Sequence, residues 1–509
     1  MGGCITVKVI LTADRTLLSE YNKHIFVGFA ACGPKIIPTW LYTKLFCPPV
    51  KEDNNGRIKY GHCGQRKLEA ALLESGFHED DIAVVRPESV DDAIDSETKV
   101  LGITTHDPLG LGPASSMFGD LAHRETFTSI FFRKIIENPM IRKHRLKVLV
   151  GGSGAWQVAD ERIMARYGID GVVMGEGEIT AVDIIKKAVD GEPFPLVSQG
   201  EVVPLEQIPL IRNPTLNGLI EVCRGCGRGC RFCNPTMLNF RCQPVERVVQ
   251  EARLNIDAGS GGVILHAEDI LRYKTKGFTP NGPEVVRLFE SVKNVTSQIG
   301  ISHFAHASVA ANEQLIEQLS HIVETGTKAC PFLSGQVGIE SGSSRMIAKY
   351  MRGKAKPFSP EEWPEMVFRS HQILQENHWV PVDTFIMGLP GEKPEDILKS
   401  KEMVEDLIDY KSIIIPLYFV PIGDLHGERF FRTKDMRPEH WQLLAVCLNH
   451  TLLWMKRMAD EYLNSAGMSP MKLWGIKRVI QYADWRLCPY LKMMREGINP
   501  LAPETKFSM

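Results

Sequence analysis

The chain has 509 residues. A single hydrophobic core rarely grows beyond about 300 residues, so we expect two or three domains. Apolar residues make up 44% of the sequence and the formal net charge is −2, which gives no reason to expect nucleic acid or an anionic membrane as a partner. No apolar run approaches the roughly 20 residues that cross a membrane, and the start, MGGCITVKVILTAD, reaches an acidic residue too early for a signal peptide. A cytoplasmic protein is therefore expected.

Short apolar runs rich in β-branched residues alternate with amphipathic stretches over residues 1–191. This alternation indicates a parallel, doubly wound sheet, so a Rossmann-like domain is expected there. The predicted strands are 5–11, 81–87, 99–105, 147–152 and 171–175, and the clearest helices are 64–75 and 179–191. Ligands of such sheets bind beyond the carboxyl ends of the strands. Three turns of small residues fall at those ends: THDPLGLGP (105–113), GGSGAW (151–156) and GEGE (175–178).

The remainder of the chain divides into three parts. Residues 192–215 are rich in proline and lack periodicity, which predicts a linker. Residues 216–425 form a second α/β series, with a helix marked by apolar residues from Val245 to Ile256. Residues 426–509 have helical, tryptophan-rich patterns and are expected to form a small helical domain beside the substrate. The strands predicted for the second series are 216–222, 261–269, 299–308, 334–341, 380–392 and 412–423, which favours an incomplete (β/α)6 barrel with its active-site loops at the strand C-termini.

Four cysteines fall within the eleven residues CRGCGRGCRFC (223–233), at the end of the first predicted barrel strand. Read whole, the spacing C-x2-C-x3-C-x2-C could close a tetrahedral zinc site, although zinc folds usually join two separated cysteine pairs. Read from Cys226, the spacing C-x3-C-x2-C supplies three ligands to a 4Fe–4S cluster and leaves the fourth iron open. The intervening glycines would let the backbone wrap the cluster. In that interpretation Cys223 packs at the strand end and is not a ligand.

The spacing from Cys226, the strand before it and the aromatic residue before the third cysteine resemble the radical S-adenosylmethionine (radical SAM) superfamily. The stretches HAED (266–269), VGIESG (337–342) with KYMRG (349–353), and GLPGE (388–392) agree with this resemblance. It implies a 4Fe–4S cluster and SAM as cofactors. The implied cluster ligands are Cys226, Cys230 and Cys233, and the implied SAM contacts are Phe232, Glu268, Asp269, Glu340, Ser341 and Gly388.

The glycine turns of the first domain resemble the cobalamin-binding domain that precedes many enzymes of this superfamily. Gly152-x-Gly154 alone also fits a dinucleotide site, but the turn follows the fourth strand and no acidic residue about 20 positions further on completes a ribose site. The D-x-H-x-x-G signature is absent, since His106-Asp107 runs in the reverse order. The resemblance thus implies cobalamin bound with its base displaced and without a histidine on cobalt. The implied contacts are Thr105, Asp107, Pro108, Leu109, Gly110, Gly151, Gly152, Ser153, Gly154, Ala155, Gly175, Glu176, Gly177 and Glu178.

Together these parts resemble a cobalamin-dependent radical SAM methyltransferase, which transfers the methyl group of methylcobalamin to an unactivated sp3 carbon after a 5′-deoxyadenosyl radical has removed a hydrogen atom. The motifs are most similar to those of the enzymes that methylate a glutamine carbon in the α subunit of methyl-coenzyme M reductase. The resemblance implies a peptide or protein substrate, a low-potential electron donor such as ferredoxin, and no nucleic acid or membrane partner. Arg478, Tyr482 and Trp485 share one helical face, which is either core or a grip for the peptide.

Three alternatives stay open. A methyltransferase or cyclase of the same family could act on a small molecule such as a tetrapyrrole. A methylthiotransferase acting on tRNA would need a second cluster, for which Cys32, Cys47 and Cys63 are the available cysteines, whereas the near-neutral charge does not favour RNA. An iron–sulfur carrier without enzymatic activity would leave the SAM-type motifs and the first domain without a role.

Overall fold

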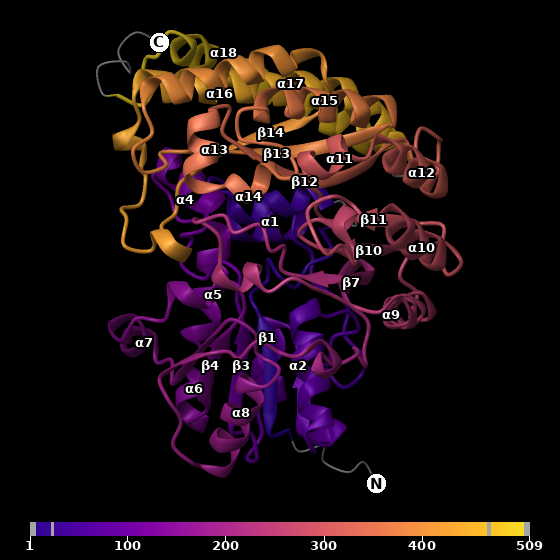
Figure 1. Ribbon diagram of the computed structural model, residues 1–509. Helices are drawn as coiled ribbons and strands as arrows, with labels where there is room; N and C mark the ends of the chain where they lie inside the picture. The colour runs from indigo at the N-terminus through magenta and orange to yellow at the C-terminus, as the bar shows by residue number, and fades with distance from the viewer. Residues whose placement is uncertain (1–6, 22–24, 466–469, 503–509) are drawn as a thin grey trace. The chain divides into compact units, whose positions relative to one another are not determined.

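The computed structural model describes residues 7–21, 25–465 and 470–502. The chain divides into two compact units (Figure 1). Unit 1 comprises Met1–Ile220 and Glu246–Val263, and unit 2 comprises Glu221–Val245 and Ile264–Met509. Among the described residues, no helix combines the length and the apolar character that crossing a membrane requires.

Unit 1 is built on a six-stranded sheet of order β2-β1-β3-β4-β5-β6, in which every neighbouring pair is parallel. Its strands are β1 (Val9–Ala13), β2 (Ile82–Val84), β3 (Val100–Thr104), β4 (Lys147–Gly151), β5 (Gly171–Met174) and β6 (Val197–Gln199). The first five confirm the strands predicted from the sequence; residues 5 and 6 of the first prediction lie outside the described residues. The strand order reverses between β1 and β3, so the ligand-binding edge of this fold is expected at their carboxyl ends.

The stretch predicted as a linker belongs to unit 1 and supplies the sixth strand of its sheet. Val197 pairs with Val172 of β5, and Val203, Ile208 and Ile211 further along are buried. A strand of three residues is too short for alternation to be detected, and the prolines around it favour the interpretation as a linker.

Helices cover both faces of the unit 1 sheet. They are α1 (Thr39–Leu45), α2 (Cys63–Glu74), α3 (Val90–Ala93), α4 (Pro113–Ala122), α5 (Phe127–Ile136), α6 (Pro139–His144), α7 (Glu161–Tyr167), α8 (Thr180–Asp190) and α9 (Val245–Asp257). Alternate residues of β1 divide between two cores, with Ile10 packed beside Phe132 and with Val9 and Leu11 packed beside Leu72. α9 belongs to this unit through a buried ion pair of 2.5 Å between Lys67 Nζ and Glu251 Oε1.

Six strands form two three-stranded sheets, of order β11-β10-β7 and β12-β13-β14, and belong to unit 2 except for residues 219–220 of β7 and Val263 of β10. A parallel bridge between His303 and Gln336 connects β11 to β12, so the strands follow one another around a partial barrel. The strands are β7 (Leu219–Glu221), β10 (Val263–His266), β11 (Ile299–Ile301), β12 (Leu333–Glu340), β13 (Trp379–Met387) and β14 (Ile413–Tyr418). They confirm the six predicted strands and the α/β fold class.

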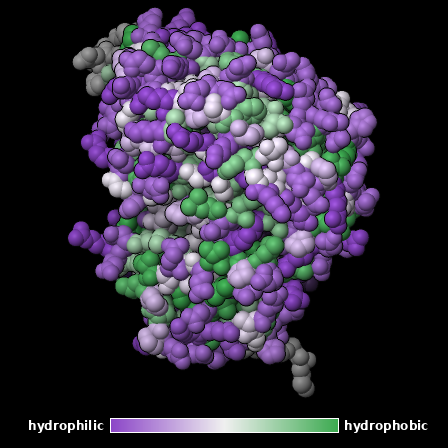
Figure 2. Space-filling model, in the orientation of Figure 1, coloured by the Kyte–Doolittle hydropathy of each residue, from purple (hydrophilic) through white to green (hydrophobic). Residues whose placement is uncertain are grey.

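The helices of unit 2 include a long C-terminal pair. They are α10 (Gly282–Lys293), α11 (His306–Ala311), α12 (Glu313–Val323), α13 (Ser344–Tyr350), α14 (Arg352–Ala355), α15 (Trp363–Glu376), α16 (Pro394–Asp406), α17 (Pro438–Ser465) and α18 (Pro470–Arg495). α17 packs on the last barrel strand: Thr451 Oγ1 donates to the Ile414 carbonyl, and Trp454 Nε1 donates to the Ile408 carbonyl. α17 is therefore an outer layer of the barrel. Mostly hydrophilic side chains cover the visible sides of α16 and α17 in Figure 2.

Candidate functional site

The cysteine loop of unit 2 begins and ends in a short antiparallel ladder, between β8 (Cys223–Arg224) and β9 (Arg241–Cys242). Gly225, Gly227 and Gly229 all have a φ between +65° and +74°, a left-handed conformation that side chains disfavour. These glycines therefore permit the sharp winding that brings the cysteines between them to one side. The N–H groups of Cys226 and Gly227 both donate to the Met237 carbonyl.

The three predicted ligands Cys226, Cys230 and Cys233 line one cavity of about 190 Å³ at the carboxyl ends of the barrel strands. Phe232, Glu268 and Glu340 line it as well, so the structure brings half of the predicted SAM contacts to the cysteines. The cavity is also lined by residues that sequence reasoning missed: Arg228, His303, Phe304, Ala305, His306, Gln336, Val337, Gly338, Lys354, Trp363 and Thr384. Gln336, Gly338 and Glu340 alternate along β12, which was the available signal for a shared face.

Asp269, Ser341 and Gly388 do not line this cavity. The Asp269 carboxylate is buried against Arg228, at 2.8 Å from Nη2. The Ser341 side chain is 1% exposed and receives the N–H of Ser343. A Cβ on Gly388 would lie 2.1 Å from the ring of Phe431, so this glycine gives space to a side chain of the chain itself.

Glu340 is held in a strained position by two partners. Its φ is +64°, and the register of β12 against β13 shifts between Gly338 and Glu340, as in a β-bulge that redirects a side chain. Lys354 Nζ donates to Oε1 at 2.7 Å, and Thr384 Oγ1 donates to Oε2 at 3.1 Å. Burial alone would lower the pKa of Lys354, but Glu340 and Cys230 outweigh it and raise that pKa. The cavity therefore contains a lysine cation beside the thiols.

Arg228, between the first two predicted ligands, fastens the cysteine loop to its surroundings. Its guanidinium donates to Asp269 Oδ2, to Ser308 Oγ and to the carbonyls of Gly353, Lys354 and Lys356. A buried arginine with this many acceptors fixes the loop geometry before any metal binds.

The three thiols are half-buried, and the pKa of each is raised. Burial raises the pKa of Cys226, that of Cys230 to about 11 and that of Cys233 to about 12. Metal binding must displace these protons, because thiolates are the ligands. Within the described ranges, the group of side chains gathered tightly enough for a single metal ion is His306, His371 and Asp383, and not the cysteines.

His306, His371 and Asp383 form a hydrogen-bonded network at the cavity wall. His306 Nε2 lies 2.8 Å from Asp383 Oδ1, and His371 Nε2 lies 3.1 Å from Oδ2. Burial alone would raise the pKa of Asp383, but the two histidines hold it well below its usual value. His371 Nδ1 lies 2.9 Å from the Val367 carbonyl oxygen, so both of its ring nitrogens are hydrogen-bonded. The network connects β13 to α11 and α15.

At the ligand edge of unit 1, two loops pack directly against each other. A Cβ on Gly152 would lie 2.4 Å from the Thr105 carbonyl oxygen, and one on Gly154 would lie 2.3 Å from that of His106. The backbone of residues 105–106 therefore occupies the space beside both glycines, which accounts for glycine at these two positions without a ligand.

Most of the other residues predicted at this edge are turned into the protein. Thr105 Oγ1 donates to the Gly151 carbonyl at 2.9 Å, Asp107 Oδ1 receives Gln157 Nε2 at 2.7 Å, and Glu176 Oε2 receives the Val203 N–H at 3.1 Å. Pro108, Gly154 and Ala155 are buried, and Leu109, Gly110, Gly151, Gly175, Gly177 and Glu178 are half-buried. The exposed positions are His106, Gly152 and Ser153. The Nδ1 atom of His106 lies 2.8 Å from Ser153 Oγ.

Asp14 is a residue at this edge that sequence reasoning missed. It directly follows β1, at the strand reversal, and is 1% exposed. Burial raises the pKa of Asp14 to about 6 even though Thr16 donates two hydrogen bonds to it, and the charge of Asp107 adds to the rise. A buried carboxyl with a raised pKa thus lies at the edge where this fold is expected to bind its ligand.

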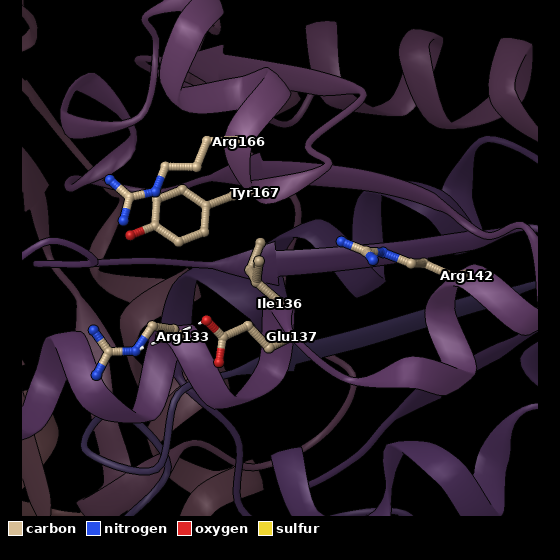
Figure 3. Close-up of a pocket in the computed structure, with 6 residues that line it drawn as sticks. All are labelled: Arg133, Ile136, Glu137, Arg142, Arg166 and Tyr167. Carbon is tan, nitrogen blue, oxygen red and sulfur yellow. Dashed lines mark ion pairs between the residues drawn. The ribbon is translucent and has the colours of Figure 1, made fainter.

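A second cavity of about 150 Å³ in unit 1 is lined by arginine side chains (Figure 3). Arg133, Ile136 and Glu137 come from the end of α5, and Arg166 and Tyr167 come from the end of α7. Helices of a parallel α/β sheet run opposite to the strands, so these ends lie at the amino edge of the sheet. This cavity is thus at the edge opposite to the predicted cofactor residues.

The helical face predicted on α18 is exposed. Tyr482 is 62% and Trp485 is 67% exposed, and their ring centroids are 5.9 Å apart. Arg478 stacks on the exposed Trp474, with its guanidinium carbon 5.4 Å from the ring centroid. Tyr482 and Trp485 are therefore not core residues.

Comparison with known proteins identifies the domain that holds the cysteine cavity. Residues 220–404 match the sequence profile of the Radical SAM superfamily. The chain is 24% identical over 274 residues to a tRNA-2-methylthio-N(6)-dimethylallyladenosine synthase of Ehrlichia chaffeensis, covering 52% of this chain and 58% of that protein. It is 21% identical over 279 residues to the ribosomal protein uS12 methylthiotransferase RimO of Thermoanaerobacter, covering 53% and 60%. The matches thus span less than two thirds of these relatives. The match to a radical SAM domain is thus limited to the segment that holds the cysteine cavity.

Two solved structures share the fold over most of the chain. The radical SAM methyltransferase TsrM of Kitasatospora setae, solved with its tryptophan substrate and a SAM analogue, aligns with a TM-score of 0.53 and 14% identity, covering 82% of this chain and 75% of TsrM. TsrM solved with cobalamin and a [4Fe-4S] cluster aligns with a TM-score of 0.52 and 14% identity, covering 82% and 74%. The likeness extends the fold match beyond the radical SAM domain.

Proposed function

We propose that this protein is a cobalamin-dependent radical SAM C-methyltransferase. The observation on which the proposal rests is the cavity that gathers three cysteines with Glu268, Glu340 and Lys354 at the strand ends of a radical SAM barrel. The TsrM-like fold, which includes a doubly wound N-terminal sheet, supports a cobalamin-dependent enzyme over other radical SAM classes.

When bound, the cluster would supply the electron that cleaves SAM, and cobalamin would supply the methyl group. Cys226, Cys230 and Cys233 would hold the cluster as thiolates, and Arg228 keeps their loop in shape. Glu340, fixed by Lys354 and Thr384, would accept hydrogen bonds from hydroxyl or ammonium groups of SAM, and Glu268 would offer a second carboxylate. Phe232, Phe304 and Trp363 make the remaining wall apolar, which excludes water from a reactive radical.

In this proposal cobalamin binds at the carboxyl edge of the unit 1 sheet. The position at the strand reversal and the exposed His106 and Ser153 support that edge. The D-x-H-x-x-G signature is absent from the sequence, so the proposed cobalamin takes no histidine on cobalt.

For the substrate we propose a peptide, namely the glutamine region of the α subunit of methyl-coenzyme M reductase. The motifs THDPLGLGP and CRGCGRGC and the exposed aromatic face of α18 support it. Exposed tyrosine, tryptophan and arginine side chains are the residue types that dominate peptide recognition. A small-molecule substrate would leave that face without a role.

A methylthiotransferase is the second candidate, because the two sequence relatives described above are named as a tRNA methylthioadenosine synthase and a ribosomal protein methylthiotransferase. Such an enzyme would need a second cluster from Cys32, Cys47 and Cys63. Cys47 is fully buried, its thiol donates to the Arg15 carbonyl at 3.3 Å, and it packs among Tyr21, Tyr42 and Phe127. This packing leaves no room for a cluster at Cys47 and favours the methyltransferase.

The test is an anaerobic incubation of the reconstituted enzyme with SAM, a low-potential reductant and the glutamine peptide. We expect one methyl group on the glutamine carbon, with 5′-deoxyadenosine and S-adenosylhomocysteine in equal amounts. Arg478→Ala should weaken methylation of the peptide but leave uncoupled 5′-deoxyadenosine formation unchanged, and Arg486→Ala, on the neighbouring face, is the matched control. A methylthio group on tRNA, or turnover of a small molecule only, would contradict the proposed substrate.

A further inference from the structure

A pair of cysteines outside the cluster motif lies at the base of the cysteine loop. Cys223 and Cys242 are directly opposite in the antiparallel ladder between β8 and β9. Their sulfur atoms are 2.7 Å apart. Residues opposite each other in such a ladder have Cα atoms about 4.5–5.5 Å apart, which lies within the range that a disulfide spans. Only a small movement therefore separates the two thiols from a covalent bond.

The two thiols differ in reactivity. The Cys223 thiol is 2% exposed and donates to Cys242 Sγ, which also receives the backbone N–H of Lys274 at 3.3 Å. These donors and the nearby Arg272 guanidinium lower the pKa of Cys242, whereas burial raises that of Cys223. The half-buried Cys242 is thus the thiolate that meets an oxidant first, and Cys223 lies behind it as the resolving thiol.

We propose that Cys223 and Cys242 are a reversible disulfide site that closes the loop of the cluster cysteines. The oxidant is a low-molecular-weight disulfide. The Cys242 thiolate attacks one of its sulfurs, and the departing thiolate takes up a proton. Cys223 then gives up its proton and attacks Cys242 Sγ, which expels the second small thiolate. The two electrons of the protein dithiol end on the small disulfide, which becomes two thiols.

The position of the bond gives it a structural consequence. The ladder between β8 and β9 consists of two residue pairs, Cys223 with Cys242 and Arg224 with Arg241, and all three cluster cysteines lie between them. Reduced, this short ladder is held by hydrogen bonds alone. In the oxidised form, the disulfide prevents the two ends of the loop from separating. The redox state of the surroundings therefore controls how firmly the loop with the iron ligands is closed.

The experiment treats the reconstituted full-length protein with oxidised glutathione, blocks the remaining thiols with iodoacetamide, and maps the peptides by mass spectrometry. We expect a peptide linked through Cys223 and Cys242, the loss of two alkylated cysteines, and full reversal by dithiothreitol. Trypsin cleavage at an arginine inside the loop should leave two fragments that stay together on a non-reducing gel and separate on a reducing gel. Unlinked peptides, or links that scramble equally with Cys226, Cys230 and Cys233, would overturn the proposal.

Serine variants separate the two steps. Cys223→Ser should accumulate glutathione on Cys242, because the resolving thiol is missing, and Cys242→Ser should leave Cys223 unmodified. Cys330→Ser, at another half-buried cysteine, is the matched control and should give the wild-type link. Iron content should be the same in all three variants. Loss of iron in Cys223→Ser or Cys242→Ser would make the pair part of the cluster site and contradict this inference, while the radical SAM activity of the wild type is tested separately.

Discussion

The same kind of signal, a short motif after a strand, predicted both the cysteine loop of unit 2 and the glycine turns of unit 1. The two regions differ in whether the residues of the motif reach a cavity. In unit 2, Cys226, Cys230 and Cys233 all reach one cavity. In unit 1, Gly152 and Gly154 face the backbone of the adjacent loop, and the exposed side chains at that edge are His106 and Ser153. A metal-ligand motif identifies the side chains that bind the metal. A glycine motif indicates only a position where the backbone packs closely against a neighbouring group.

The largest expected effect is at the cysteines. Replacing Cys226, Cys230 or Cys233 by alanine removes one of three iron ligands, so bound iron and 5′-deoxyadenosine formation should both fall to background. Iron analysis and chromatography of the products measure this. Cys223→Ala is the control and should retain its iron; equal loss there would indicate a four-thiolate site and remove the contrast between the two motifs.

The Lys354–Glu340 pair should have the next largest effect, on stability. The side chains are 16% and 9% exposed, so Lys354→Met leaves a nearly buried carboxylate without its cation and should cost about 3–5 kcal/mol. Chemical unfolding should give a lower midpoint, and the double variant Lys354→Met/Glu340→Gln should recover most of the loss. If the double variant is no more stable than Lys354→Met, the pair is not the source of the effect.

Gly154→Val tests the packing of the two loops at the carboxyl edge of the unit 1 sheet. Gly154 has a φ of −93°, which any residue adopts, so the substitution should act only through the clash with the His106 backbone and cost about 1–3 kcal/mol. Gly177→Ala, where a Cβ meets Ala181 at an ordinary 3.6 Å, is the matched control. Thermal unfolding compares the two, and iron content should be unchanged in both. An equally stable Gly154→Val protein would contradict the loop packing.

The smallest expected effect is that of Ser153→Ala. The side chain is exposed, so stability should change by less than about 0.5 kcal/mol. Loss of one hydrogen bond should weaken cobalamin binding by up to about tenfold, measured by titration of the reconstituted protein. Ser75→Ala, at the end of α2 and so at the opposite edge of the sheet, should leave the affinity unchanged. Tighter or equal binding by Ser153→Ala would exclude this residue from the contact.

The sequence predicted most strands of both units, because apolar β-branched runs bounded by turns are a local signal. It also predicted Phe232, Glu268 and Glu340, which follow from family motifs at strand ends. It did not predict β6, whose three residues lie among prolines, or the direction of Asp269 and Ser341 into the protein. Lys354 was missed because its contact with Glu340 depends on a bulge in β12 and on the path of α14, which are tertiary features.

The most direct test of the proposed function is an absorption spectrum with iron, sulfide and cobalt analysis of protein that is purified and reconstituted without oxygen. We expect one 4Fe–4S cluster and an equimolar amount of cobalamin with its base displaced. Cys226→Ala should lose the iron and keep the cobalt, and Gly154→Val should keep the iron. Full methyltransferase activity in a protein free of cobalt, or zinc in place of iron at the cysteines, would contradict the account.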